Sequence, residues 1–271
     1  MISVILVTKD EEERIKACLE SVKWADELIV FDNGSTDKTI EIAKKYTDNI
    51  VYSPGRIDYQ EVRNRAMDKA KGDWVLYVDA DERVLEPLKK ELIEISQSSD
   101  KSAYALSRKN IIFGKEVNYG PYKKDWMIRF FKKDKFKTWV GKVHEYATFD
   151  GNLGYTKNSL LHLTHRDVDH FVLKTLNWSN IYAGLLLDSK HPKMSSWRFF
   201  RIIISESFEQ GIKRGGFFAG TVGVIDSLLQ IFSQLITYIK LWQLQQPKKI
   251  DQVYDDIDKK LIEDDFKYDE D

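Results

Sequence analysis

The stretch GDWVLYVDADERV, residues 72–84, joins an apolar run to three closely spaced carboxylates, Asp79, Asp81 and Glu82. Two carboxylates that flank a small residue at the end of a strand converge on one hard cation, Mg²⁺ or Mn²⁺, when a diphosphate supplies further oxygens. Like charges this close resist joint ionisation unless a cation neutralises them. The alternative is structural, with Asp81 and Glu82 capping a helix that starts near Glu86.

The elements around this stretch alternate between strand and helix over the first 100 residues. Apolar runs predict strands at 2–8, 26–32, 49–53 and 73–78, and helical spacing predicts helices at 9–22, 37–46 and 58–70. Such alternation predicts a parallel sheet with helices on both faces. Ligands of these sheets bind beyond the carboxyl ends of the strands, where the polar turns after Val7, Phe31 and Val78 would lie.

The pattern changes after Ser99. SAYALSRKNIIF and DWMIRFFKKD are typical of strands, whereas residues 166–190 and 197–213 have helical spacing. The predicted organisation is a catalytic α/β domain over 1–165, with a nucleotide-binding half at 1–100 and an acceptor half at 101–165. A helical region over 166–249 and an acidic tail over 250–271 follow.

Charge is balanced overall, with 42 basic and 43 acidic residues, but it is unevenly distributed. Residues 101–142 hold 12 basic and three acidic residues, which indicates an anionic ligand or surface, and 250–271 holds ten acidic residues, typical of a solvated, partly disordered end. A single cysteine, Cys18, and the lack of a secretory signal at the start predict a cytoplasmic protein. Neither zinc-ligand spacing nor an RNA-binding signature appears, so we expect no nucleic-acid partner.

Three segments in order carry a family resemblance: SVILVTKDEEERIKACLESV, ADELIVFDNGSTDKTIEIAKKY and RNRAMDKAKGDWVLYVDADE. They resemble the first strand and helix, the second strand with its Asp-x-Gly-Ser-Thr-Asp turn, and the D-x-D strand of family 2 glycosyltransferases. MIRFFKKDKFKTWVGKVHE resembles the subgroup with lipopolysaccharide-core β-glucosyltransferases. The resemblance implies a GT-A, Rossmann-like fold: a mixed, mainly parallel sheet flanked by helices, here with a helical C-terminal appendage.

The resemblance also implies roles for individual residues. Thr8, Asp32, Arg63, Asp79, Ala80 and Asp81 would bind the nucleotide sugar, with Asp32 on the uracil and Asp79 on the ribose or sugar; Asp81 and His162 would hold the metal. The alternative for Asp32 is an Asx turn, for Arg63 a surface position on a helix, and for His162 a hydrogen-bonded structural histidine.

Inverting transfer needs a general base for the acceptor hydroxyl. The resemblance places Glu145 in that role, with Asp125 as the rival and a surface glutamate at a strand end as the alternative. The Gln-x-x-Arg-Trp motif of processive synthases is absent, so we expect transfer of one sugar, glucose favoured, from a UDP-sugar donor. A catalytically silent sugar-nucleotide-binding protein is the alternative function.

The acceptor side is less defined. The basic run RFFKKDKFK is either a solvated strand face or a site for an anionic acceptor, and the acceptor would be a saccharide or lipid-linked. Segment 217–242 is apolar but contains Asp226, which favours a helix lying at the inner face of the cytoplasmic membrane over one that spans it. Packing on the catalytic domain or in a homo-oligomer is the alternative.

Overall fold

The computed structural model describes residues 1–53, 59–141, 146–263 and 266. The chain forms two compact units, Met1–His165 and Arg166–Asp271.

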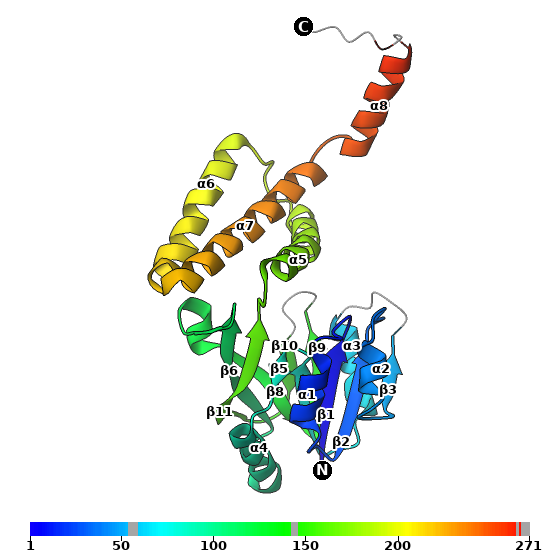
Figure 1. Cartoon of the computed structure of the whole chain (residues 1–271), viewed down its shortest axis with the longest axis vertical. Helices are drawn as coiled ribbons and strands as arrows, with labels where there is room; N and C mark the ends of the chain where they lie inside the picture. Colours follow the sequence, from blue (N-terminus) through cyan, green and yellow to red (C-terminus); the bar gives the residue numbers. More distant parts are fainter. Residues whose placement is uncertain (54–58, 142–145, 264–265, 267–271) are drawn as a thin grey trace. The chain divides into compact units, whose positions relative to one another are not determined.

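The first unit is built on a mixed sheet (Figure 1). Its strands are β1 (Ile2–Thr8), β2 (Glu27–Asp32), β3 (Ile50–Tyr52), β4 (Trp74–Asp79), β5 (Glu82–Arg83), β6 (Ala103–Ile112), β7 (Lys115–Val117), β8 (Trp126–Lys132) and β11 (Leu153–Thr164). The order across the sheet is β3-β2-β1-β4-β8-β6-β11-β5, with β7 paired to the outer part of β6. β9 (Phe136–Val140) and β10 (Tyr146–Phe149) form a separate antiparallel pair. The predicted α/β class is therefore confirmed.

The two halves of the sheet pair differently. β1 to β4 run parallel to one another, as the alternating sequence predicts. β8 is antiparallel to both β4 and β6, so it joins the parallel half to the rest of the sheet. β6 and β11 are again parallel to each other. The printed pairing of β8 with β4 covers the first residues of β4, from Trp74 opposite Lys132 to Leu76 opposite Phe130.

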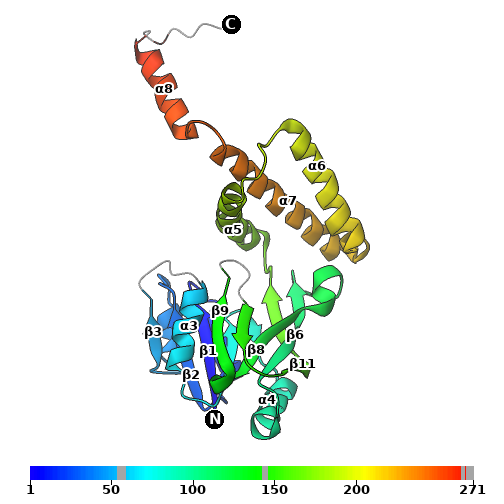
Figure 2. The ribbon, with the colours of Figure 1, turned by 180° about the vertical axis from the view of Figure 1, so that it is seen from behind.

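Helices and the small hairpin cover the two faces of this sheet. The helices are α1 (Ile15–Val22), α2 (Thr39–Ala43), α3 (Tyr59–Lys69) and α4 (Glu86–Ser98), with short 3₁₀ turns η1 (Gly120–Lys124) and η2 (Lys133–Lys135). α1 and α4 pack on one face, where Cys18, Leu19 and Leu92 join the buried core. α3 and β9 pack on the other, where Val62 and Trp139 do so (Figure 2).

The second unit is helical. It consists of α5 (Val168–Asp188), α6 (Ser196–Glu206), a π-helical turn η3 (Ser207–Lys213), a 3₁₀ turn η4 (Gly216–Phe218), α7 (Gly220–Leu244) and α8 (Ile250–Glu263). A small core of Ala183, Met194, Ile202 and Leu241 joins α5, α6 and α7. Gly223 of α7 packs against the backbone of Gly216 so closely that a Cβ would lie 2.4 Å from the Gly216 carbonyl oxygen. Small residues therefore hold η4 against α7.

α7 turns its polar and small residues inward. Its buried residues are Gly223, Asp226, Ser227, Ile231, Thr237 and Leu241, whereas Ile225, Leu228, Phe232, Ile239, Trp242 and Leu244 are exposed. Among the described residues, α7 is the one helix long and apolar enough to cross a membrane, judged by length and composition only.

α8 lies within the acidic segment that begins at residue 250, where Ile250–Glu263 is helical. All of its described side chains except those of Ile250 and Leu261 are exposed. Val253, Tyr254 and Ile257 recur at helical spacing, and this apolar periodicity within an acidic composition accounts for the helix.

Candidate active site

The carboxyl edge of β1 to β4 gathers the first predicted site residues. Thr8 is paired with Asp32 across β1 and β2, and Val7 is paired with Asp79 across β1 and β4. Within the described part of the chain, three buried polar atoms at this edge have no hydrogen-bond partner: Thr8 Oγ1, Asn33 Oδ1 and Ser53 Oγ. Buried polar atoms are normally satisfied, so these unsatisfied ones are available to a polar ligand at the ends of β1, β2 and β3.

Asp32 closes the turn that follows β2. Its two carboxylate oxygens accept hydrogen bonds from the Ser35 backbone N–H at 3.1 and 3.2 Å, which is the Asx turn considered as the alternative. The loop after β1 is bonded to the same turn, because Asp10 Oδ1 accepts from Thr36 N at 2.7 Å. The two loops are therefore held together at the edge of the sheet.

Asp79 lies between two buried arginines. Its carboxylate pairs with Arg63 at 3.0 Å through one oxygen and with Arg129 at 2.5 Å through the other. Burial raises the pKa of Asp79, but the charges of Arg129 and Arg63 outweigh this and hold it well below the ordinary value of 3.8. The charge of Asp79 is thus neutralised by the protein itself, and this carboxylate does not need the cation predicted for the pair.

Arg63 is not a surface residue, contrary to the alternative considered for it. Only 7% of it is exposed, and its guanidinium lies 5.0 Å from the ring centroid of Trp139 and 5.7 Å from that of Tyr77. Its Nε and Nη1 atoms find no hydrogen-bond partner among the described residues. The helix therefore turns Arg63 inward, toward Asp79.

Sequence reasoning missed Arg129. It is 4% exposed, and its Nε and Nη1 atoms also lack a partner within the described residues. The only signal was an arginine inside the otherwise apolar run MIRFF of β8. A buried strand seldom carries an unpaired charge, so that pattern could have prompted a search for a buried carboxylate.

Glu82 is hydrogen-bonded to the backbone of the turn that contains Asp79 and Asp81. It is fully buried, accepts a hydrogen bond from Asp79 N at 2.9 Å, and has its other oxygen 3.7 Å from Arg108 Nη1. Burial, and then the charge of Asp79, raise the pKa of Glu82. The helix-capping alternative for Asp81 and Glu82 is wrong, because Leu85 occupies the N-cap of α4 and Glu82 belongs to β5.

Asp81 and His162 meet at the same turn. Asp81 Oδ2 lies 3.4 Å from His162 Nε2, and the Asp81 backbone oxygen accepts from Leu163 N at 2.9 Å. The two residues are 81 positions apart in the sequence and are joined by the pairing of β5 with β11. In the described part of the chain no cluster of three or more His, Cys, Asp or Glu side chains could hold a metal ion. At this turn the described residues therefore offer one carboxylate oxygen, from Asp81, and one imidazole nitrogen, from His162.

This donor pair fits a divalent cation whose other positions are taken by ligand or water oxygens. Mg²⁺ and Mn²⁺ prefer oxygen donors and keep several water or phosphate oxygens, and Mn²⁺ also accepts imidazole. Two protein donors at one turn therefore suit a cation that arrives with a diphosphate rather than one caged by protein alone.

Comparison with known proteins identifies the fold and chemistry. The family model "Glycosyl transferase family 2" matches residues 3–152. The chain belongs to this family. It is 30% identical to an uncharacterized glycosyltransferase of Rickettsia bellii over 90% of this chain and 86% of that protein. It is 26% identical to the lipopolysaccharide core biosynthesis glycosyltransferase LpsC of Rhizobium meliloti over 89% and 92% of the two chains.

A weaker likeness to a solved structure also appears. The crystal structure of glucosyl-3-phosphoglycerate synthase from Mycobacterium tuberculosis with Mn²⁺ and UDP-glucose is 27% identical, with a TM-score of 0.36, over 40% of this chain and 43% of that one. That score is too low for its bound molecules to be transferred here. The GT-A fold and the glycosyltransferase activity predicted for this family 2 enzyme are nevertheless confirmed by the family match.

Three further predictions for the glycosyltransferase concern Ala80, Glu145 and Asp125. Ala80, between the two aspartates, is 4% exposed, and its carbonyl accepts from Arg83 Nη1 at 2.8 Å. Glu145, the predicted base, lies outside the described residues. Both oxygens of the rival, Asp125, accept hydrogen bonds from Arg108 at 2.8 and 2.9 Å. A carboxylate committed in this way is poorly placed to take a proton from an acceptor.

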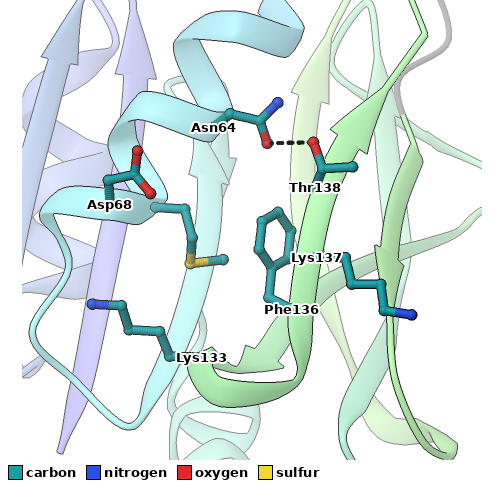
Figure 3. Close-up of a pocket in the computed structure, with 7 residues that line it drawn as sticks. Asn64, Asp68, Lys133, Phe136, Lys137 and Thr138 are labelled. Carbon is teal, nitrogen blue, oxygen red and sulfur yellow. Dashed lines mark hydrogen bonds between the residues drawn. The ribbon is translucent and has the colours of Figure 1, made fainter.

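A hollow of about 310 Å³ lies elsewhere on this glycosyltransferase, between α3 and β9 (Figure 3). It is lined by Asn64, Met67, Asp68, Lys133, Phe136, Lys137 and Thr138. Asn64 and Thr138 are hydrogen-bonded across it at 3.2 Å, and Lys137 pairs with Asp150. None of the predicted site residues lines it, so we assign it no part in sugar transfer.

Proposed function

We propose that the enzyme moves one sugar, with inversion, from a UDP-sugar to a saccharide or lipid-linked acceptor with the help of Mg²⁺ or Mn²⁺. The observation that carries this proposal is the meeting of Asp81 Oδ2 and His162 Nε2 at the carboxyl edge of the sheet, 3.4 Å apart. When bound there, the cation would neutralise charge on the departing diphosphate.

The donor site would lie along the edge from Thr8 to Asp81. Thr8 Oγ1, which has no hydrogen-bond partner among the described residues, would hydrogen-bond the nucleoside, and Asp32 would accept from the uracil N–H. Asp79, held rigid by Arg63 and Arg129, would contact the ribose or the sugar. Ala80, being small, lets the diphosphate approach the backbone between the two aspartates.

Glu145 is our proposed base. It would remove the proton of the acceptor hydroxyl as that oxygen attacks the anomeric carbon from the face opposite the diphosphate. Glu145→Gln should keep donor binding and lose transfer. Normal turnover of that variant would exclude Glu145 as the base.

Titration calorimetry with Mn²⁺ would test the donor by comparing UDP-glucose, UDP-galactose, UDP-N-acetylglucosamine and GDP-mannose. We expect UDP-glucose to bind most tightly, and preferred binding of GDP-mannose would contradict the uracil role of Asp32. NMR of the product would report the anomeric configuration. Donor binding without any transfer or UDP-sugar hydrolysis would instead support a catalytically silent binding protein.

The acceptor is proposed to belong to cell-envelope glycan synthesis of the lipopolysaccharide-core kind. Similarity to LpsC over most of both chains supports this. Absence of the Gln-x-x-Arg-Trp motif from the sequence supports the addition of a single sugar rather than a polymer.

We further propose that the second unit of this cytoplasmic enzyme contacts the inner face of the membrane. Five apolar side chains recur along one face of α6 and η3, and more than half of each is exposed: Trp197, Phe200, Ile204, Phe208 and Ile212, here called the α6–η3 stripe. Arg198 and Arg201 lie in the same helix. Aromatic and aliphatic residues with adjacent arginines suit anionic headgroups.

Vesicle co-sedimentation of the full chain tests this contact. We expect binding to vesicles that contain phosphatidylglycerol, weakened by salt, and little binding to pure phosphatidylcholine. If the chain binds neither kind of vesicle and sediments as a dimer in the ultracentrifuge, a second copy covers the α6–η3 stripe instead.

A further inference from the structure

Behind His162 lies a chain of hydrogen bonds that sequence reasoning did not foresee. Arg108 donates to Asp125, Asn110 donates to Asp125, and Asn110 is bonded to His162. Asn110 is 1% exposed and pairs with His162 across β6 and β11. This relay concerns the proposed metal site, so its role rests on the proposed function.

Asp125 decides which way the Asn110 amide points. Arg108 Nε and Nη2 bind the two oxygens of Asp125 at 2.8 and 2.9 Å, and a carboxylate paired with arginine only accepts hydrogen bonds. The group of Asn110 that faces Asp125 Oδ2 at 2.9 Å must therefore be the donor, Nδ2. The amide oxygen of Asn110 is left facing His162.

That oxygen decides the tautomer of His162. Asn110 Oδ1 lies 2.6 Å from His162 Nδ1, and an amide oxygen is an acceptor, so Nδ1 carries the hydrogen. In the neutral ring Nε2 then keeps its lone pair. This lone pair lies 3.4 Å from Asp81 Oδ2, which is itself an acceptor. Two acceptors turned toward each other repel unless a proton or a metal cation lies between them.

We propose that Asn110, oriented by Asp125 and Arg108, is a positioning residue that fixes His162 in the Nδ1–H tautomer and presents Nε2 to the metal. The other tautomer would direct an N–H at the cation. Partners that orient a ligating histidine in this way raise metal affinity by about 10- to 100-fold. Glu82 is fully buried, and its Oε1 lies 3.7 Å from Arg108 Nη1.

The tautomer can be read in the metal-free protein. Long-range ¹H–¹⁵N spectra of the full chain labelled on histidine distinguish a protonated from a bare ring nitrogen, and His162→Gln identifies the signals of His162. We expect a protonated Nδ1 and a bare Nε2. A protonated Nε2 with a bare Nδ1 would overturn the proposal.

Mn²⁺ affinity, measured by the electron paramagnetic resonance of free Mn²⁺, gives the second readout. Asn110→Leu should weaken Mn²⁺ binding about 10- to 100-fold. Asp125→Asn should weaken it too, because the new amide lets Asn110 turn over and shift His162 to the Nε2–H tautomer. The matched control is Ser107→Ala, which removes another β6–β11 hydrogen bond, to Ser159 at 2.7 Å, without touching the relay.

The outcomes separate the two proposals. Unchanged Mn²⁺ affinity in Asn110→Leu and Asp125→Asn, with a folded protein by thermal unfolding, would overturn the relay and leave the proposed function standing. Failure of the wild-type chain to bind Mn²⁺ would overturn the metal site itself, and the tautomer spectrum would still decide the orientation of the ring.

Discussion

The two units of this glycosyltransferase differ in how much of their apolar side chains is exposed. In Met1–His165 the run Trp74–Val78 is buried, with no residue more than 3% exposed. In Arg166–Asp271 the α6–η3 stripe is more than half exposed along its whole length. Among the described residues, six large apolar side chains are exposed in the first unit and 25 in the second.

The two units also differ in the polar residues that they bury. The first unit buries charge where it can be paired, as with Asp79 between Arg63 and Arg129. α7 of the second unit buries Asp226, Ser227 and Thr237 and exposes Leu228, Phe232 and Leu244. Exposed apolar surface on this scale marks an interaction site. This contrast supports the proposals that the first unit binds a polar ligand and that the second contacts an apolar partner.

The largest effect is expected at Asp81. Asp81→Ala should lower metal-dependent sugar transfer by about 10³-fold or more, since the bound cation contributes several kcal/mol to charge stabilisation. Vesicle binding should not change. The control is Asp73→Ala at the opposite end of β4, where the carboxylate is 81% exposed and pairs with the N-terminus. Full activity of Asp81→Ala would refute the metal site.

Replacing a phenylalanine by alanine should destabilise the fold strongly in the first unit and only slightly in the second. Phe131→Ala, in a fully buried position, should cost about 3–5 kcal/mol of unfolding free energy. Phe200→Ala, 62% exposed, should change stability by less than about 0.5 kcal/mol and weaken vesicle binding. Urea unfolding and co-sedimentation measure the two. Strong destabilisation by Phe200→Ala would mean that the stripe belongs to a core.

Removing one arginine tests the charges buried in the first unit. Arg129→Met should destabilise the fold by about 3 kcal/mol, because Asp79 loses one of two buried partners. Lys137→Met breaks a pair with Asp150 whose side chains are 56% and 68% exposed, and should cost less than about 1 kcal/mol. If urea unfolding shows that Arg129→Met and Lys137→Met lower the unfolding free energy by the same amount, the Arg129–Asp79 pair does not behave as a buried ion pair.

Stability of the first unit should depend on pH through Asp79. Its pKa is lowered in the folded chain, so its stabilisation is present above the ordinary value of 3.8 and is lost as pH falls below it. The unfolding free energy of the wild type should exceed that of Asp79→Asn at pH 7, and the gap should close below about pH 4. A gap that stays constant down to pH 3 would contradict this.

The smallest effect is expected from single arginines of α6. Arg198→Gln or Arg201→Gln should weaken binding to phosphatidylglycerol vesicles about fivefold, since a basic residue near an anionic surface contributes about 1 kcal/mol. Binding to phosphatidylcholine should not change. If the double variant Arg198→Gln/Arg201→Gln binds anionic vesicles as tightly as the wild type, these arginines make no electrostatic contribution to the proposed membrane contact.

Local patterns in the sequence determined the parallel half of the fold and part of the site. Strand–helix alternation, the D-x-D turn and the polar turns after β1 and β2 are all contained within short stretches, so periodicity and motif spacing predict them. Asp81 was predicted as a metal ligand from the D-x-D pattern, whereas His162, which lies beside it, was predicted only from the family resemblance.

Tertiary structure alone decided the partners of those residues. Arg129 reaches Asp79 because β8 pairs antiparallel with β4, and Asn110 reaches His162 because β6 pairs with β11. These contacts join residues about 50 positions apart, and no local pattern encodes which strands become neighbours. The burial of polar residues in α7 was likewise undetermined, because helical spacing defines a face but the packing of α5 and α6 decides which face is covered.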